Sequence, residues 1–446
     1  MKKVFGFFAM MLAIAACNKN EIELPVENAG TIPFTATISV ENSAATKALA
    51  ESGSTIEATW AAGEKVALIY TVGTTTYVAE AEVTPQTDGT ATISTTLDGS
   101  PADDTDVTIV YPASAVDATT KDVKTDLLVS QNGLLTGDGS ISKMYDLRKT
   151  TSPAKLKIDG TTASLKGLVS LTNQFAIFKF TIQDISATAQ NATEFKVSDG
   201  SGNVITTVTP SPTSGELYVA LPVMAAGTYW FNATIDSKPY IAKATTTAAT
   251  SAGNYYQTTV KMATLGDVIL STGKFAAAGT DGSVAKIVYV GSDTAEAAYN
   301  HGLALALSDA SGSGCKWKTS NTDAGHTKQS STFTSESGLQ YNATHNTDDY
   351  PAFKAAIANN NTASPTGCSA WFLASGYQWA KIIASYGLDN LKNTAGVYTG
   401  LQSTVNYWSS SEADNYNAWR FYPNAGSWSN WNKDTAVPLV RSCLAF

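Results

Sequence analysis

The stretch that decides the fold class is Phe175-Ala176-Ile177-Phe178-Lys179-Phe180-Thr181-Ile182. Every second residue from Ala176 to Ile182 is apolar, and in an extended chain such residues share one face. This stretch therefore predicts a β-strand with one face turned toward a core.

Similar short strands are predicted on both sides of this stretch. Turn residues such as Gly73 and Asp88-Gly89 separate them, while 113–165 is looser and a second block begins near Gly167. The other predicted strands are 33–40, 65–70, 76–83, 90–97, 106–111, 194–197, 204–208, 216–223, 228–235, 240–244 and 255–262. Strands of this length at such regular spacing indicate β-sandwiches.

The composition changes after about residue 263. Seven of the nine tryptophans lie between Trp317 and Trp431, and helical patterns appear for the first time. Asp348-Asp349 could cap a helix over 350–359, and Ser375 could cap one over 376–386. Strands return at 406–410, 418–422 and 438–446, so we expect an α+β domain rich in loops and aromatic residues.

The chain is thus predicted to be mainly β, with two tandem β-sandwich domains followed by an α+β domain. The expected borders are 1–17 for a signal peptide, 18–47 for a propeptide or linker with the first strand, 48–165 and 166–263 for the sandwiches, and 264–446 for the last domain.

The first 17 residues predict export. Lys2 and Lys3 precede an apolar run over 4–14, which is too short to span a bilayer as a mature helix. Ala15-Ala16-Cys17 resembles the lipobox of bacterial lipoproteins, and the resemblance implies that Cys17 is acylated and anchors the protein to the outer membrane. The alternative is a plain signal peptide in which Cys17 is incidental.

Composition and motifs argue against two functional classes. A net charge of −9 argues against a nucleic-acid partner. The sequence contains no Gly-x-Ser-x-Gly, no His-Glu-x-x-His, no phosphate-binding loop and no dinucleotide fingerprint. His301, His326 and His345 are too far apart for a local metal motif, so we expect ordinary surface or loop histidines. We therefore expect no enzyme, no metal and no cofactor.

The part that contains the first two blocks resembles the fimbrillin family of pilins from the Bacteroides group. The resemblance is carried by Ile56-Glu57-Ala58-Thr59-Trp60, Ala62-Gly63-Glu64-Lys65-Val66-Ala67, Tyr111-Pro112, Val129-Ser130-Gln131 and Tyr145-Asp146-Leu147. It covers roughly 31–262 and implies two transthyretin-like sandwich domains.

The same resemblance implies a mode of assembly. Fimbrillin-like pilins are lipoproteins that are cut after a basic residue, which removes an N-terminal strand and opens a groove for a strand of the neighbouring subunit. Lys47, in Ala45-Thr46-Lys47-Ala48, is the expected cut site; the alternative is an ordinary exposed lysine.

The last domain is similar to a repeated bacterial surface domain of C-type lectin-like fold. The similarity is carried by Trp371-Phe372-Leu373-Ala374-Ser375, Tyr407-Trp408-Ser409-Ser410-Ser411-Glu412, Ala418-Trp419-Arg420-Phe421-Tyr422 and Val440-Arg441-Ser442-Cys443-Leu444-Ala445-Phe446. Ala374 stands where the family has proline. Lys433 interrupts the Trp-Asn-Asp triplet of calcium-dependent lectins, which argues against calcium-dependent sugar binding. Among the three pairings open to Cys315, Cys368 and Cys443, the resemblance favours a Cys368–Cys443 disulfide.

If 438–446 is a core strand, the chain can accept a strand but has none to donate, which describes a pilus tip. We expect a fimbrial tip subunit that binds a glycan or a host or bacterial surface protein. The alternatives are a monomeric glycan-binding surface lipoprotein and, with less support, a surface hydrolase.

The candidate ligand-binding residues combine aromatic faces with carboxylates and amides. They are Trp408, Glu412, Asp414, Tyr416, Trp419, Trp428, Trp431 and Asn432. Trp408 and Trp419 could instead belong to the core, as could Trp371 and Trp379. Trp428 and Trp431 are the better candidates because they lie in a predicted loop rich in Ser, Asn and Gly.

Overall fold

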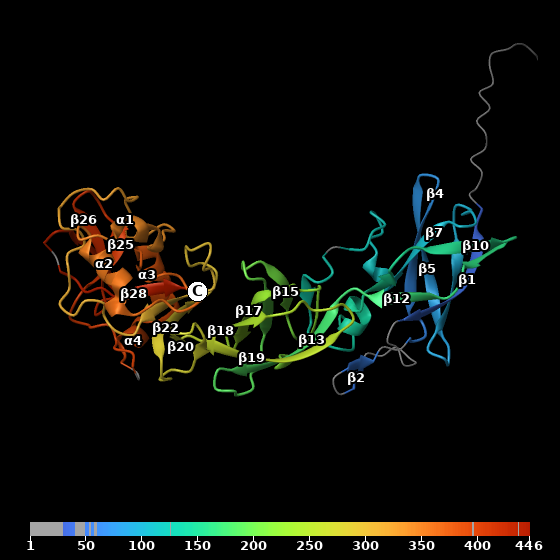
Figure 1. Cartoon of the computed structure of the whole chain (residues 1–446), viewed down its shortest axis with the longest axis horizontal. Helices are drawn as coiled ribbons and strands as arrows, with labels where there is room; N and C mark the ends of the chain where they lie inside the picture. Colours follow the sequence, from blue (N-terminus) through green and yellow to red (C-terminus); the bar gives the residue numbers. More distant parts are fainter. Residues whose placement is uncertain are drawn as a thin grey trace, which may run out of the picture.

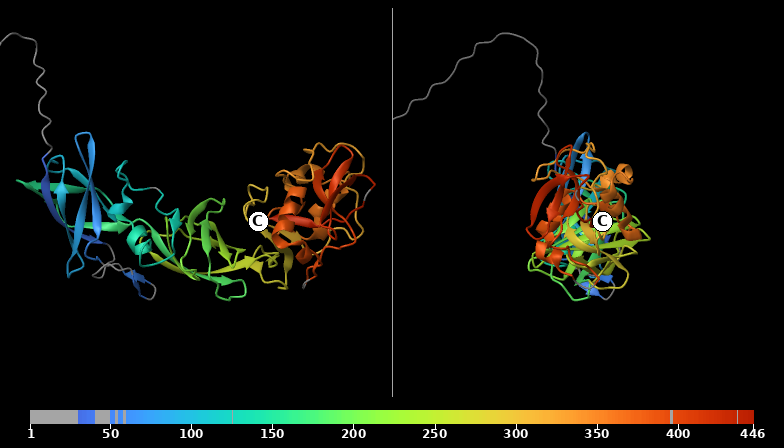
Figure 2. Two further views of the ribbon diagram at one scale, coloured as in Figure 1. Left: turned by 180° about the vertical axis from the view of Figure 1, so that it is seen from behind. Right: turned by 90° about the vertical axis from the view of Figure 1, so that its left-hand side faces the viewer.

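The computed structural model describes residues 30–40, 50–52, 55–57, 60–124, 126–394, 397–435 and 437–446. Cys17 and Lys47 lie outside these ranges. The fold is mainly β and contains several sheets. Three bodies follow one another along an elongated molecule, with the helices gathered at the end opposite to β1, as Figure 1 shows. The end-on view in Figure 2 shows how narrow this arrangement is.

The first body is a nine-stranded sheet that curls back on itself. The order is β10-β11-β1-β12-β9-β7-β4-β5-β6, and further pairings join β1 to β6 and β10 to β7. Its strands are β1 (Ile32–Val40), β4 (Lys65–Val72), β5 (Thr75–Pro85), β6 (Ala91–Leu97), β7 (Asp106–Tyr111), β9 (Arg148–Thr150), β10 (Ala154–Asp159), β11 (Thr162–Leu165) and β12 (Val169–Asn173). A separate hairpin consists of β2 (Ala50–Ser52) and β3 (Thr55–Glu57).

The second body is an eight-stranded sheet with the order β16-β13-β19-β18-β17-β14-β15-β8. Its strands are β8 (Ser130–Gln131), β13 (Ala176–Asp184), β14 (Glu194–Ser198), β15 (Val204–Val208), β16 (Glu216–Leu221), β17 (Gly227–Ile235), β18 (Lys238–Thr246) and β19 (Tyr255–Thr264). The predicted alternation is confirmed in β13, where Ala176, Phe178, Phe180 and Ile182 are all buried. The chain crosses between the two sheets more than once, because β8 joins the second sheet and β9 to β12 join the first.

The third body, which we call the C-terminal body, combines two sheets with helices. The six-stranded sheet has the order β21-β20-β22-β23-β28-β24, and the three-stranded sheet has the order β25-β26-β27. The strands are β20 (Val268–Leu270), β21 (Phe275–Ala276), β22 (Ser283–Val290), β23 (Gly302–Ala306), β24 (Phe372–Leu373), β25 (Tyr407–Glu412), β26 (Asn417–Tyr422), β27 (Ser427–Asn432) and β28 (Ser442–Ala445). The helices are α1 (Asn342–His345), α2 (Pro351–Ala358), α3 (Gly376–Tyr386) and α4 (Leu388–Lys392).

Both predicted helices exist, but only one has the predicted cap. Ser375 and Gln378 form a reciprocal capping box at the start of α3, at 3.1 Å and 3.0 Å. The prediction that Asp348-Asp349 caps α2 is wrong, because Tyr350 holds the cap position without a side-chain bond. Pro351 is the first residue of this helix, a position where the backbone N–H that proline lacks would have no partner within the helix.

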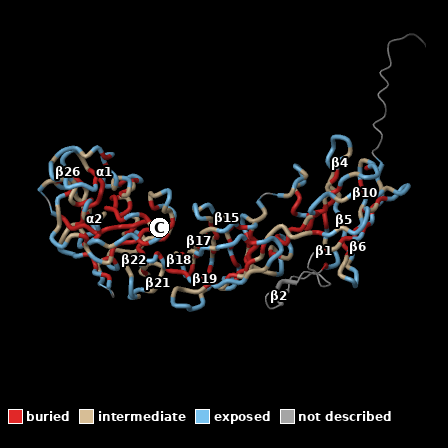
Figure 3. Tube along the Cα trace, in the orientation of Figure 1, coloured by how far each residue is buried: buried red, intermediate tan, exposed pale blue. Residues whose placement is uncertain are grey.

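The second and third bodies share one core. Trp230 and Ile241 of the eight-stranded sheet pack with Ile287, Leu444 and Phe446 of the six-stranded sheet. Figure 3 shows buried residues running continuously through this junction, where the C-terminus also lies. No helix in the part of the chain that the structure describes is long and apolar enough to cross a bilayer.

Candidate functional site

Strand β1 is held on both of its edges. On one edge it pairs antiparallel with β6, from Ile32 opposite Leu97 to Ile38 opposite Ala91. On the other edge it runs parallel to β11 at Phe34 and to β12 from Ile38 onward. We call the cleft that these three strands form around β1 the β1 seat.

The side chains of β1 alternate between the core and solvent. Phe34 is 1% exposed and Ile38 is 0% exposed, and Ala36 and Val40 are buried with them. Thr35 and Thr37 point outward and are exposed. Without β1, the seat would present an apolar trough and unpaired backbone groups on two strand edges, which is the surface that an added strand can fill.

The connection from β1 to the rest of the chain is a single covalent link. It runs through residues 41–49 to β2, and Lys47 lies in it, outside the described residues. A cut anywhere in this link would leave β1 held only by its hydrogen bonds and its side chains.

The last strand, β28, is central as well. It lies between β23 and β24, and Phe446 exchanges backbone hydrogen bonds with Gly302 at 3.0 Å and 3.1 Å. Arg441, just before β28, is fully buried and pairs with Asp309 at 2.8 Å. Removing Arg441 and β28 would therefore break two strand pairings and separate a buried ion pair.

The expected disulfide is contradicted by the structure. Cys315, Cys368 and Cys443 are all free thiols, and each packs against a different apolar cluster. Cys443 and Leu444 are neighbours on β28, so their side chains point to opposite faces of the sheet. Cys368 packs with the cluster of Leu444, on the face away from Cys443.

Two predicted ligand-binding residues are parts of the core. Trp408 and Glu412 are 0% exposed, and the Trp408 Nε1 donates to the Cys315 carbonyl at 2.8 Å. They cannot meet a ligand in this structure, so Trp408 follows the alternative of a core residue, and the expectation of an accessible side chain at Glu412 is wrong.

Two more of these residues also make contacts within the chain. Trp419 donates through Nε1 to the Gln329 carbonyl at 2.8 Å. The Asp414 carboxylate accepts from the backbone N–H groups of Tyr416 and Asn417 at 2.7 Å and 2.8 Å, which closes a turn.

Lys433 is the residue that interrupts the lectin triplet. Its ammonium group lies among several oxygen atoms of neighbouring residues. Its ammonium pairs with Glu412, and both side chains are fully buried. It also donates to the carbonyls of Asp414 at 3.1 Å and Asn415 at 3.0 Å. Lys328 binds the other oxygen of Glu412. These oxygen atoms are therefore already bound by ammonium groups.

Trp428 and Trp431 lie on strand β27 rather than in a loop, which corrects the prediction. Because they are three residues apart, their side chains point to opposite faces of the strand. Trp428 faces inward and meets Phe333 at 4.5 Å and Phe421 at 5.4 Å between ring centroids. Trp431 is 49% exposed, and the Arg420 guanidinium lies 4.0 Å from its ring centroid. The neighbouring Asn432 accepts from the Asp434 backbone at 3.1 Å.

Tyr416 and Trp431 are the most exposed of the predicted ligand-binding residues, with Tyr416 60% exposed. Trp431 lies beside a hollow, which Arg420 also lines. Trp431 was among the predicted residues, but the sequence carries no signal for Arg420. Its role depends on the pairing of β26 with β27, which places its guanidinium against the Trp431 ring.

The three histidines are buried rather than exposed at the surface; His301 and His326 lie in loops, as predicted, whereas His345 lies in α1. The Nε2 atoms of His326 and His345 lie 2.9 Å apart, and burial lowers the pKa of His326 to about 3 and of His345 to about 4. His301 stacks on Trp230 at 3.9 Å, and burial lowers its pKa to about 4. No cluster of three or more potential metal ligands exists among the described residues.

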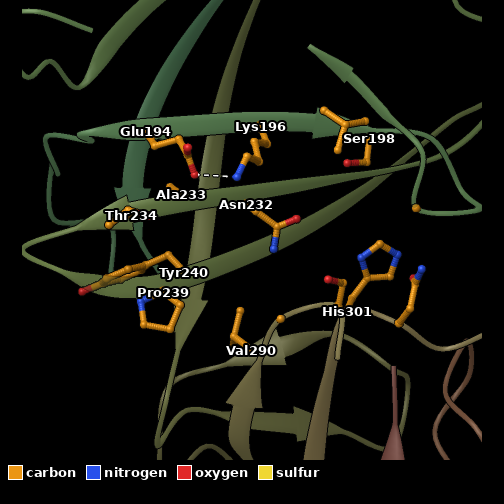
Figure 4. A pocket seen from close by; sticks show the side chains of 15 residues that line it. Glu194, Lys196, Ser198, Asn232, Ala233, Thr234, Pro239, Tyr240, Val290 and His301 are labelled. Atoms are coloured by element: carbon orange, nitrogen blue, oxygen red, sulfur yellow. Dashed lines mark ion pairs between the residues drawn. The ribbon is translucent and has the colours of Figure 1, made fainter. Parts of the chain in front are cut away.

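A pocket lies at the junction of the second and third bodies, between β14, β17 and β18 on one side and Val290 and His301 on the other (Figure 4). Glu194 and Lys196 form an ion pair across its wall at 2.7 Å. Both charged residues lie on β14 and pair with each other.

No family model and no curated protein matches this sequence. Among solved structures, the fold is similar to a fimbrial protein from Bacteroides ovatus, with 14% identity, 93% of this chain and 99% of that chain covered, and a TM-score of 0.33. It is also similar to a fimbrial assembly protein from Parabacteroides distasonis, with 13% identity, 51% and 90% coverage, and a TM-score of 0.27. Since both TM-scores lie below 0.5, neither likeness carries an argument about function.

Proposed function

We propose that this protein is a fimbrial subunit that accepts a strand from a neighbouring pilin in the β1 seat, stands at the pilus tip, and presents its C-terminal body to a ligand. The observation that carries the proposal is the position of β1. It is the first strand of the described chain, it is central in its sheet, and one short link joins it to the remainder.

Strand addition requires two things of an acceptor, and the β1 seat supports both. Backbone groups of β6 on one edge and of β11 and β12 on the other supply hydrogen bonds to any sequence. The positions now filled by Phe34, Ala36, Ile38 and Val40 accept alternate side chains and so select a register.

The position at the tip is supported by β28. A subunit within a stalk must offer a strand as well as accept one. Here β28 is paired on both edges and is followed directly by the backbone contacts of Phe446 with Gly302. β28 is therefore built into the core of the C-terminal body and does not serve as a donor strand, which supports a role of this body in contacting a ligand.

The proposal is tested by exchanging β1 in the whole protein. The full chain is cut with a lysine-specific protease, and a fluorescent peptide with the sequence of Ile32–Val40 is added. We expect an early cut after Lys47, followed by slow uptake of the peptide. A Lys47→Gln variant should stay uncut at this point and take up no peptide.

A matched peptide with Asp in place of Ile38 provides the control, because a carboxylate cannot enter the apolar trough. Equal uptake of both peptides, or no uptake by the cut protein, would contradict strand exchange. N-terminal sequencing of the protein from cells separates the alternatives: a start at Ala48 supports the subunit, whereas a working form that retains an acylated Cys17 supports a monomeric surface lipoprotein.

A further inference from the structure

A groove of about 460 Å³ lies on the C-terminal body beside the face of β26 and β27 that carries Arg420 and Trp431. Its other walls come from segments near residues 312–313, 402–406 and 437–439, which are far apart in the sequence. This volume is in the range of sites that hold small molecules.

Arg420 is the only charged residue among the described residues that line the groove. Its Nε donates to Ser429 Oγ at 3.1 Å, and its guanidinium lies against the Trp431 ring. No carboxylate lies within ion-pair distance of it in the described ranges.

The chain has two other arginines, and both are paired: Arg148 with Asp146 at 3.0 Å and Arg441 with Asp309 at 2.8 Å. Arg420 is therefore the exception in a chain with 38 acidic and 29 basic residues. It is also partly buried, which weakens its hydration. A partly desolvated guanidinium that no acid neutralises is a strong binding partner for an external carboxylate.

The remaining lining is aromatic or neutral and polar. Trp431 offers an exposed ring, and Thr404, Asn406 and Thr435 add hydroxyl and amide groups. Aromatic rings bind the C–H faces of sugars, and hydroxyl and amide groups match sugar hydroxyls.

We infer that this groove binds an acidic sugar, with its carboxylate on Arg420 and its ring against Trp431. One cation among neutral polar groups suits one carboxylate on a hydroxyl-rich ring, whereas an acidic peptide with several carboxylates would need more cations. This inference rests on the proposed function, because it names the class of ligand that the C-terminal body would bind.

The test compares matched pairs of ligands on the full-length protein. An array carries oligosaccharides that contain uronic or sialic acids, each beside its carboxyl-reduced counterpart, together with acidic peptides. We expect at least one acidic oligosaccharide to bind about tenfold or more tightly than its reduced partner, the effect of a hydrogen bond to a charged group. Raising the salt concentration should weaken this preference.

Four variants locate the binding site. Arg420→Gln should abolish the preference for the acidic member, and Trp431→Ala should weaken binding of both members. Lys274→Gln removes an exposed charge outside the groove, and Val397→Ala removes an exposed apolar side chain outside it, so both should bind as the unchanged protein does. Thermal unfolding of each variant checks that the C-terminal body remains folded.

The inference is overturned if the acidic and reduced sugars bind equally, if only acidic peptides bind, if nothing on the array binds, or if Arg420→Gln binds normally. None of these results affects exchange of β1, which takes place in the first body. Failure of the ligand assignment and failure of the strand-acceptor function are therefore distinguishable.

Discussion

The first and the last strands of the described chain are both central, yet they are held in different ways. β1 is held by alternating apolar side chains such as Phe34 and Ile38, and it buries no charged group. β28 follows the buried Arg441, and the body around it also buries Glu412 and Lys433. A strand of the first kind can leave and be replaced without leaving a buried charge unpaired, whereas loss of the second together with Arg441 would deprive Asp309 of its cationic partner. The difference shows that centrality alone does not decide whether a strand is exchangeable.

The largest effect is expected in β1. Phe34→Ala removes a ring that is 1% exposed and should lower the free energy of unfolding of the first body by about 3–5 kcal/mol. Trp60, in the same core, reports this transition by fluorescence. Thr37→Ala, on the exposed side of the same strand, is the control and should leave the transition in place. Equal stability of both variants would mean that apolar side chains do not hold β1.

The next effect concerns the buried charges of the C-terminal body. Lys433→Met leaves Lys328 as the one ammonium that pairs with Glu412 and should cost about 3 kcal/mol, because a buried carboxylate loses one of its two cationic partners. Denaturant unfolding followed by tryptophan fluorescence measures the change, since seven of the nine tryptophans lie in this body. Lys354→Met, which breaks the exposed pair with Asp348, should have no measurable effect. An unchanged denaturation midpoint of the Lys433→Met variant would contradict the view that buried charges stabilise the C-terminal body.

The third effect is a histidine-linked pH dependence that only the C-terminal body should show, since all three histidines lie beyond residue 300. Burial lowers the pKa of His326 to about 3 and of His345 to about 4, so both stay neutral in the folded state while the unfolded chain binds protons below about pH 6.5. Their contribution to stability is complete above that pH and falls by about 1 kcal/mol per pH unit for each histidine as the pH drops toward 4.

Denaturant midpoints of the C-terminal body between pH 7 and 4.5 measure this loss. A His326→Asn/His345→Gln double variant should show a shallower pH dependence, and the first body should show the same dependence in both proteins. A slope that the double variant leaves unchanged would assign the acid sensitivity to other groups.

The smallest effect is expected at the start of α3. Ser375→Ala removes both the cap of this helix and the hydrogen bond to the Glu336 carbonyl at 2.6 Å, and should cost about 1–2 kcal/mol. Ser330→Ala, at an exposed position of the same body, serves as the control. A loss limited to the C-terminal body would show that its helices are held by local polar contacts, in contrast to the apolar contacts of β1.

Sequence reasoning succeeded where a local pattern repeats. The alternation in β13 and the Ser375 cap of α3 are confirmed, and β1 was predicted to within one residue. It failed at β27, whose Ser and Asn residues mask the alternation, because this edge strand buries little of either face. It also missed the contact between His326 in a loop and His345 in the short helix α1, which lie 19 residues apart in a region without a repeating pattern.

The amino-acid sequence alone determined which short segments extend, which faces are apolar, and that the aromatic residues concentrate near one end. Only the tertiary structure decided that β1 has neighbours on both edges, since β6 and β12 lie far along the chain from it. Likewise, only the folded structure shows that Trp428 and Trp431 point to opposite faces of β27 and that Arg420 lies against the Trp431 ring. The physical reason is that alternation depends on neighbouring residues, whereas edges, ion pairs and grooves depend on contacts between segments that the sequence keeps apart.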